Sequence, residues 1–260
     1  METCIKLLCN EHVKKCVILP SSFHDVDELL EHFDKRHILF CRDAASYEYC
    51  LRHCPHSQVY LENDMAFHLL LDELKPAALS ERTENEEEEK LKKALNYLPR
   101  WMKRNMSRAT VSSSMNRKKQ KFAFLLRTDK EKKTDLSSPL AYDISLCWHT
   151  PPKNKFNANL LLAFSDTLRQ ADIIVSDRLH VCIMAYLSGR EVYMIDNTYG
   201  KLKGVYDQTL QQNKRVHLTQ PDTLPEDLRI AWNKLNNPLR IFFYKSFDKA
   251  KLIIKRILQK

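Results

Sequence analysis

The stretch that decides the fold is ADIIVSDRLHVCIMAYLSGREVYMIDNTYGK, residues 171–201. Its first apolar run, Ile173–Val175, is short and β-branched, which predicts a buried strand. The next run, Val181–Leu187, contains Met, Ala and Leu and stops before Gly189, which is typical of a short helix with a glycine C-cap. Val192–Ile195 then has the pattern of a second strand. The stretch therefore predicts a β-α-β unit with parallel strands.

Polar side chains follow both predicted strands, in residues 177–180 and 196–201. In parallel sheets, ligands bind outside the carboxyl ends of the strands, where loops and helix N-termini converge. Arg178 offers a planar fork for a carboxylate or phosphate, and His180 can exchange a proton near neutral pH. The pair suits a small anionic substrate that also needs a proton. The structural alternative is an Arg–Asp pair that holds the loop and a histidine that satisfies a backbone group.

Two motifs in this stretch, DRLH at 177–180 and DNTYGK at 196–201, resemble those of the polysaccharide pyruvyltransferase family in order and position. The resemblance extends over most of the chain, through segments similar to the family's R-x-D-x-E, L-P-Q-S, R-E-x-x-S and D-M-A-F: here RTDKE at 127–131, LPSS at 19–22, RDAASYE at 42–48 and DMAF at 64–67. It implies an α/β, GT-B-like architecture of two Rossmann-like domains with parallel sheets. A family member should begin with a strand and a G-G-G-N-x-G-D loop, which this chain lacks, so the N-terminal domain is expected to be incomplete.

The resemblance also implies an activity, the transfer of the carboxyvinyl group of phosphoenolpyruvate onto two sugar hydroxyls of a polysaccharide or glycan precursor, giving a pyruvate ketal. Arg127 and Arg178 would bind the donor's anionic groups, and His180 would be the general acid. The candidate substrate-binding residues are Asp177, Leu179, Asn197, Tyr199, Lys201, Arg42 and Asp64. Asp177 would orient its loop, whereas Arg42 and Asp64 would meet the sugar. Asp129 and Glu131 are either solvated charges or partners that hold Arg127.

Other functions stay open at this point. A degenerate, non-catalytic relative could act as a binding protein, and a GT-B glycosyltransferase using a nucleotide sugar would share the two-domain arrangement. The basic residues 100–121 include Trp101, which could stack on a nucleobase, but no nucleic-acid fold signature accompanies them, so we expect no nucleic-acid partner.

Composition also indicates which partners, cofactors and cellular compartment to expect. The formal charge of +9 favours anionic partners, and the three glycines exclude both G-x-G-x-x-G and a P-loop. The eight cysteines indicate a reducing compartment, and the absence of a signal sequence or transmembrane run predicts a cytoplasmic protein without a membrane span. Cys50, His53, Cys54 and His56 match no standard zinc spacing. We expect no metal and no cofactor, with phosphoenolpyruvate as donor substrate, because arginines and a proton donor supply what the reaction needs.

Periodicity and composition divide the chain into a partial Rossmann-like domain (1–79), a charged helical linker (80–121) and a donor-binding Rossmann-like domain (122–260). The predicted strands are 15–19, 37–41, 59–61, 122–126, 144–148, 173–175, 192–195 and 215–218. The predicted helices are 25–34, 44–53, 159–170, 181–187, 224–235 and 241–258, with Val26, Leu29, Leu30 and Phe33 inward in the first and Tyr47, Cys50 and Leu51 inward in the second.

Overall fold

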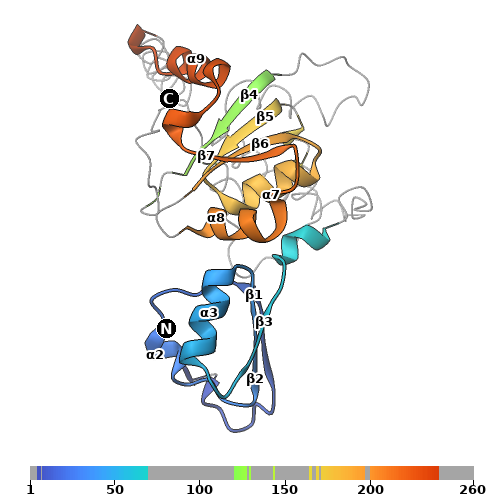
Figure 1. The fold of residues 1–260 in the computed structure, drawn as a ribbon, viewed down its shortest axis with the longest axis vertical. Coiled ribbons are helices and arrows are strands. Elements are labelled where there is room, and N and C mark those ends of the chain that lie inside the picture. The colour runs from blue at the N-terminus through green and yellow to red at the C-terminus, as the bar shows by residue number, and fades with distance from the viewer. Residues whose placement is uncertain are drawn as a thin grey trace, which may run out of the picture.

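The structure, a computed structural model, contains two separate parallel β-sheets with helices packed on them (Figure 1). It describes residues 5–6, 8–69, 120–127, 129, 143, 164–165, 168–169, 171–196 and 200–239. We call the units built on the two sheets the first and the second domain. The chain is thus an α/β protein with two Rossmann-like sheets, as its sequence predicts.

The first domain has three parallel strands in the order β1-β2-β3. Its elements are β1 (Cys16–Ser21), α2 (Asp27–Leu30), β2 (His37–Cys41), α3 (Ala44–His53), β3 (Gln58–Leu61) and the 3₁₀ helix η1 (Met65–His68). Alternate strand residues, Leu39, Cys41 and Val59 among them, are buried against the helices. Both α2 and α3 lie on one side of this sheet (Figure 1).

Two details of the first domain differ from the sequence prediction. The helix expected over 25–34 is only the single turn α2, because Asp25 has a positive φ of 51° and the chain turns again before Asp34. Leu30 and Phe33 are nevertheless buried, so the apolar spacing was read correctly although the helix length was wrong. Helix α3 has the predicted bounds, but Leu51 is 47% exposed, since one residue of helix rotates it about 100° away from buried Cys50.

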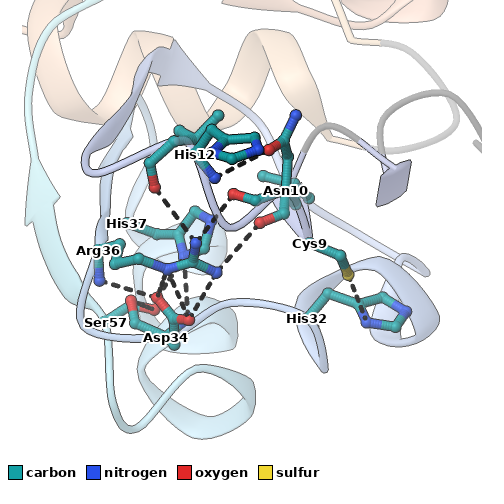
Figure 2. A network of polar contacts seen from close by, with 10 residues as sticks. Cys9, Asn10, His12, His32, Asp34, Arg36, His37 and Ser57 are labelled. Atoms are coloured by element: carbon teal, nitrogen blue, oxygen red, sulfur yellow. Dashed lines mark hydrogen bonds and ion pairs between the residues drawn. The ribbon is translucent and has the colours of Figure 1, made fainter.

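A polar network holds the N-terminal segment against the first domain (Figure 2). Arg36 donates to the carbonyls of Leu8, Asn10 and Val13 at 3.1–3.3 Å. Its Nε is bound by both carboxylate oxygens of Asp34, at 3.1 and 3.0 Å. One guanidinium therefore satisfies three carbonyls of a segment that has little regular structure.

The second domain has four parallel strands in the order β4-β5-β6-β7. Its strands are β4 (Gln120–Leu125), β5 (Ala171–Ser176), β6 (Glu191–Ile195) and β7 (Val216–Thr219). Its helices are α7 (Leu179–Leu187), α8 (Lys201–Val205), the π-helical turn η3 (Tyr206–Leu210), the 3₁₀ turn η4 (Pro221–Thr223) and α9 (Glu226–Leu235). The predicted β-α-β unit is present, and Gly189 ends α7 with a φ of 77°. Strand β4 starts slightly before the expected domain boundary at 122.

Helices cover both faces of the second sheet. On one face, α7 and α8 pack with Ile174, Val192 and Met194. On the other face, α9 packs through Leu228 and Trp232 against the strand residues Phe124, Val175 and Ile195 and against Leu126, which directly follows β4. This two-sided burial explains why β5 and β6 are almost continuously apolar.

Several predicted elements lie wholly or partly outside the described residues: the linker over 80–119, the strand over 144–148, most of the helix over 159–170, and the helix over 241–258. Within the helix predicted over 159–170, Phe164 and Leu168 are helical and are buried in the second-domain core, as expected. In the part of the chain that the structure describes, no helix is both long and apolar enough to cross a membrane.

Candidate functional site at the domain junction

The carboxyl ends of the two parallel sheets face each other, and loops that follow them touch. Asp64, after β3, lies 3.6 Å from His180 on α7, measured from Oδ2 to Nε2. The Thr209 hydroxyl donates to Oδ1 of Asn63 at 2.8 Å. The polar edges of both domains therefore meet at one junction. This is the edge where a parallel sheet is expected to bind its ligands.

Apolar contacts support the same junction. Ala66 and Phe67 of η1, which follows Asp64 directly, pack against the second-domain core, and the Phe67 and Tyr186 rings are 6.4 Å apart between centroids. Gly204 on α8 approaches the first domain so closely that a Cβ there would lie 2.7 Å from Cβ of Asp43. Only glycine fits this approach without a shift of α8 or of the backbone at Asp43.

Four side chains of the first domain form a hydrogen-bonded chain that leads to His180. Asp43 caps α3 by accepting from the Ser46 amide at 2.8 Å, and it also accepts from the Ser22 hydroxyl at 2.7 Å. Arg42 donates from Nε to Ser22 at 2.9 Å and from Nη1 to Asp64 at 2.6 Å. The LPSS, RDAASYE and DMAF segments, far apart in sequence, thus converge on one network.

Asp64 is buried yet strongly acidic. Burial alone would raise the pKa of Asp64, but polar contact with His180, the Ala66 amide and the Arg42 guanidinium together hold the pKa well below its usual range. The carboxylate is therefore ionised throughout the physiological pH range.

In the second domain, a compact charge cluster brings together both predicted arginines. Arg127 binds Asp129 in a bidentate manner, at 2.7 Å from Nε and 3.2 Å from Nη2. Arg178 donates from Nε to buried Asp143 at 2.9 Å and pairs with it again through Nη2. Nη2 of Arg178 also lies 2.8 Å from Asp129, so this half-exposed carboxylate bridges the two guanidiniums.

Asp177 directly precedes Arg178 and contacts the backbone of Arg127. It is buried, and its Oδ1 accepts from the backbone amide of Arg127 at 2.7 Å, which ties the end of β5 to the end of β4. Burial raises the pKa of Asp177 to about 6, although the Arg127 amide and the positive charges of Arg127 and Arg178 oppose the shift. That Asp177 orients this loop for substrate stays a prediction.

The other predicted site residues of the second domain are not part of the polar contacts described above. Leu179 is buried in the second-domain core, where its side chain packs against apolar neighbours instead of facing the polar edge. Lys201 is the first residue of α8, whose N-terminus is capped by Asp196 through the amides of Leu202 and Lys203, both at 3.2 Å. Asn197 and Tyr199 lie outside the described residues.

Sequence reasoning missed two members of the site. Asp143 received no role, because a single carboxylate before a predicted strand gives no signal of a partner 35 residues away. Ser22 was noted only as part of a motif, whereas it joins Arg42 to Asp43. Of the two alternatives for Asp129, a solvated charge or a partner of Arg127, the structure shows the ion pair with Arg127.

The described residues contain no group of three or more His, Cys, Asp or Glu side chains that could hold a metal ion. Cys50 and Cys54 are instead buried thiols in the first-domain core, while His53 lies 3.1 Å from Asp27. Burial raises the pKa of the Cys54 thiol to about 12, which makes it a poor metal ligand and nucleophile.

These observations define the class of protein: a two-domain α/β protein whose polar site is shared by the carboxyl ends of two parallel sheets. The polysaccharide pyruvyl transferase family model matches residues 3–199, and the chain belongs to this family, which is a family of transferases. No curated protein matches the chain in sequence.

One solved structure, of a functionally uncharacterised protein from Klebsiella pneumoniae subsp. pneumoniae NTUH-K2044, is 22% identical to the chain, with a TM-score of 0.47. The similarity covers 79% of this chain and 64% of that one, so the chain spans less than two thirds of that protein's length.

Proposed function

We propose that the protein transfers the carboxyvinyl group of phosphoenolpyruvate to two hydroxyls of a saccharide, forming a pyruvate ketal and releasing phosphate. The observation that carries the proposal is that His180, two residues after Arg178 on the second domain, contacts Asp64 of the first domain, which is paired with Arg42. Family membership supports a pyruvyl transfer reaction in general. The donor and the saccharide acceptor are our inference.

The residues fit the chemistry of such a donor. Phosphoenolpyruvate carries a carboxylate and a phosphate, which call for guanidinium groups and backbone amides. Among the described residues, Nη1 of Arg178 has no acceptor, and no side chain caps the N-terminus of α7. The amides of the first turn of α7 therefore add a second feature that favours an anion beside Arg178.

The reaction begins with a proton transfer from the protein to the donor. His180 protonates the methylene carbon of the donor, giving a cation at the adjacent carbon that a sugar hydroxyl attacks. Loss of phosphate regenerates a cation, and the second hydroxyl attacks it to close the ketal. Of the two hydroxyl protons, one replaces the proton taken from His180 and the other leaves on the phosphate, so the reaction is balanced without a cofactor.

One observation favours a second candidate, the non-catalytic binding protein. Both arginines already pair with carboxylates, Arg127 with Asp129 and Arg178 with Asp143, as the structural alternative for this loop requires. A relative that has lost donor binding would keep these ion pairs. The two candidates differ in whether phosphate is released from phosphoenolpyruvate.

The test is transfer activity in the full chain, with phosphoenolpyruvate and a panel of glucosides, galactosides and mannosides that have free 4- and 6-hydroxyls. We expect a product with the mass of a pyruvate ketal, formed together with free phosphate. His180→Gln should lower kcat by about 10²–10⁴-fold, the usual contribution of a general acid.

His217→Gln is the matched control, because His217 is also partly exposed and lies 3.2 Å from a carboxylate, Glu191, but away from the junction. It should keep full activity. No ketal with any acceptor, despite a folded wild-type chain, would favour the non-catalytic candidate, whereas equal activity of the two variants would remove His180 from the mechanism. Binding of a nucleotide sugar, without phosphoenolpyruvate binding, would favour a glycosyltransferase.

A further inference from the structure

His180 is held from the opposite domain. It lies in the first turn of α7, its side chain is 66% exposed, and among the described residues its ion-pair partner is Asp64 of the first domain. An exposed histidine without a partner would sample several rotamers. The orientation of this ring therefore depends on a contact across the junction.

Asp64, in contrast, is held in place by burial and by hydrogen bonds to both of its carboxylate oxygens. Its side chain is 5% exposed, its Oδ1 accepts from the Ala66 amide at 2.9 Å, and its Oδ2 accepts from Arg42. Arg42 is anchored in turn through Ser22 to Asp43, the cap of α3. The carboxylate is thus a rigid point of the first domain, connected to the start of a ten-residue helix.

We infer that Asp64 is a positioning residue for His180, and that the first domain thereby controls the orientation of the proton donor on the second. A carboxylate beside Nε2 restricts the ring's orientation and leaves Nδ1 as the nitrogen that can transfer a proton. The consequence for the reaction rests on the proposed function, but the coupling of Asp64 to His180 is a property of the protein without substrate. Asp64 then acts through His180 and not as a contact to the sugar.

Gly204 offers an independent way to disturb the same contact. It belongs to α8 and touches none of the three residues Asp64, Arg42 and His180 in the described contacts, yet a Cβ there would overlap Asp43. Gly204→Ala should push the two domains apart at this point. Because alanine favours helix, the substitution should not weaken α8 itself.

The first experiment uses no substrate. Histidine ring NMR signals are recorded for the full chain and for Asp64→Asn, Gly204→Ala and the control Glu191→Gln. Asp64→Asn and Gly204→Ala should shift the His180 signals and increase the ring's motion while leaving His217 unchanged, and Glu191→Gln should do the reverse. An unchanged His180 signal in folded Asp64→Asn would overturn the inference.

The second experiment uses the transfer reaction. Asp64→Asn should lower kcat at least about tenfold, as loss of a group that orients a reacting side chain usually does, with KM for phosphoenolpyruvate unchanged. Asp64→Glu should recover part of the rate. A rise in KM for the saccharide with kcat unchanged would instead make Asp64 a sugar contact and contradict the inference.

The two experiments separate two kinds of failure. If the wild-type chain forms no ketal but His180 still responds to Asp64→Asn, the proposed function fails and the positioning contact stands. If ketal forms but His180 does not respond, the function stands and the positioning role fails.

Discussion

Among the single residues, the buried aspartates Asp64 and Asp177 have pKa values shifted in opposite directions because their partners differ. Asp64 lies beside Arg42 and His180, which offset its burial and lower its pKa. Asp177 is hydrogen-bonded directly to a backbone amide, and burial raises its pKa to about 6. The folded protein thus favours the ionised form of Asp64 and disfavours the ionised form of Asp177.

This difference predicts a pH-dependent effect of Asp177→Asn. A carboxyl whose folded-state pKa is raised from 3.8 to about 6 stabilises the protein fully below pH 3.8 and loses that contribution as the pH rises through 6. Asparagine can still accept from the Arg127 amide and carries no charge. We expect the variant to gain stability at pH 7 by up to about 3 kcal/mol, since one pKa unit corresponds to ~1.4 kcal/mol.

Urea unfolding at pH 7 and pH 4 measures this effect, and the gain should shrink at pH 4. Asp177→Ala is the control, because it leaves the buried amide unpaired and should destabilise the protein by about 1–3 kcal/mol. An Asn variant that is less stable than wild type at pH 7 would show that the ionised carboxylate is needed.

Asp129 supports a second prediction at this scale. Its carboxylate, 45% exposed, lies between the two guanidiniums, where the carboxylate of an anionic donor would be placed. Asp129→Asn should therefore strengthen phosphoenolpyruvate binding, by about tenfold or ~1.4 kcal/mol. Calorimetry measures the change, with Asp172→Asn, near Arg190, as the control. Weaker binding would mean that Asp129 mainly holds Arg127 in place.

At the scale of elements, the sequence predicted long periodic or strongly apolar segments best. The bounds of α3 and β2 are as predicted, and β5, α7 and β6 differ only at their ends. The helix over 25–34 was overestimated, because a positive φ at Asp25 is a backbone property that periodicity does not reveal. Leu51 was misplaced for a related reason, since a helix position one residue from the buried stripe can still be exposed.

The N-terminal segment, residues 8–13, is held against the first domain by Arg36. Arg36→Ala removes three hydrogen bonds to carbonyls of residues 8–13, so amide hydrogen exchange in this segment should accelerate at least about tenfold. The sheet amides should keep their protection. Arg52→Ala, on the exposed surface of α3, is the control and should change neither.

Acid should release the same segment. Hydrogen bonding to Arg36 lowers the pKa of Asp34 to about 2, so this ion pair stabilises the segment above pH 3.8 and is lost as the pH falls toward 2. Protection of the wild-type segment, relative to unfolded-chain exchange at the same pH, should therefore fall in that window and approach that of Arg36→Ala. A segment equally protected at pH 2 and pH 6 would contradict this role of the pair.

At the scale of the whole molecule, the sequence predicted two parallel α/β units but not which residues of one would touch the other. The edge rule for parallel sheets placed Arg42, Asp64, Arg178 and His180 at strand ends, and the junction brings Asp64 and His180 together. The partner pairs could not be predicted, because an ion pair such as Arg178–Asp143 depends on loop positions with no sequence period.

Calorimetric titration of phosphoenolpyruvate into the full chain measures whether the proposed donor binds beside Arg178. We predict binding to wild type, loss of binding in Arg178→Ala and weaker binding in Arg178→Lys, which keeps the charge near Asp143 but lacks the planar fork. Arg190→Ala, on the same domain, should bind as wild type. No binding by folded wild type, or equal binding by wild type and both Arg178 variants, would contradict the proposed donor site at Arg178.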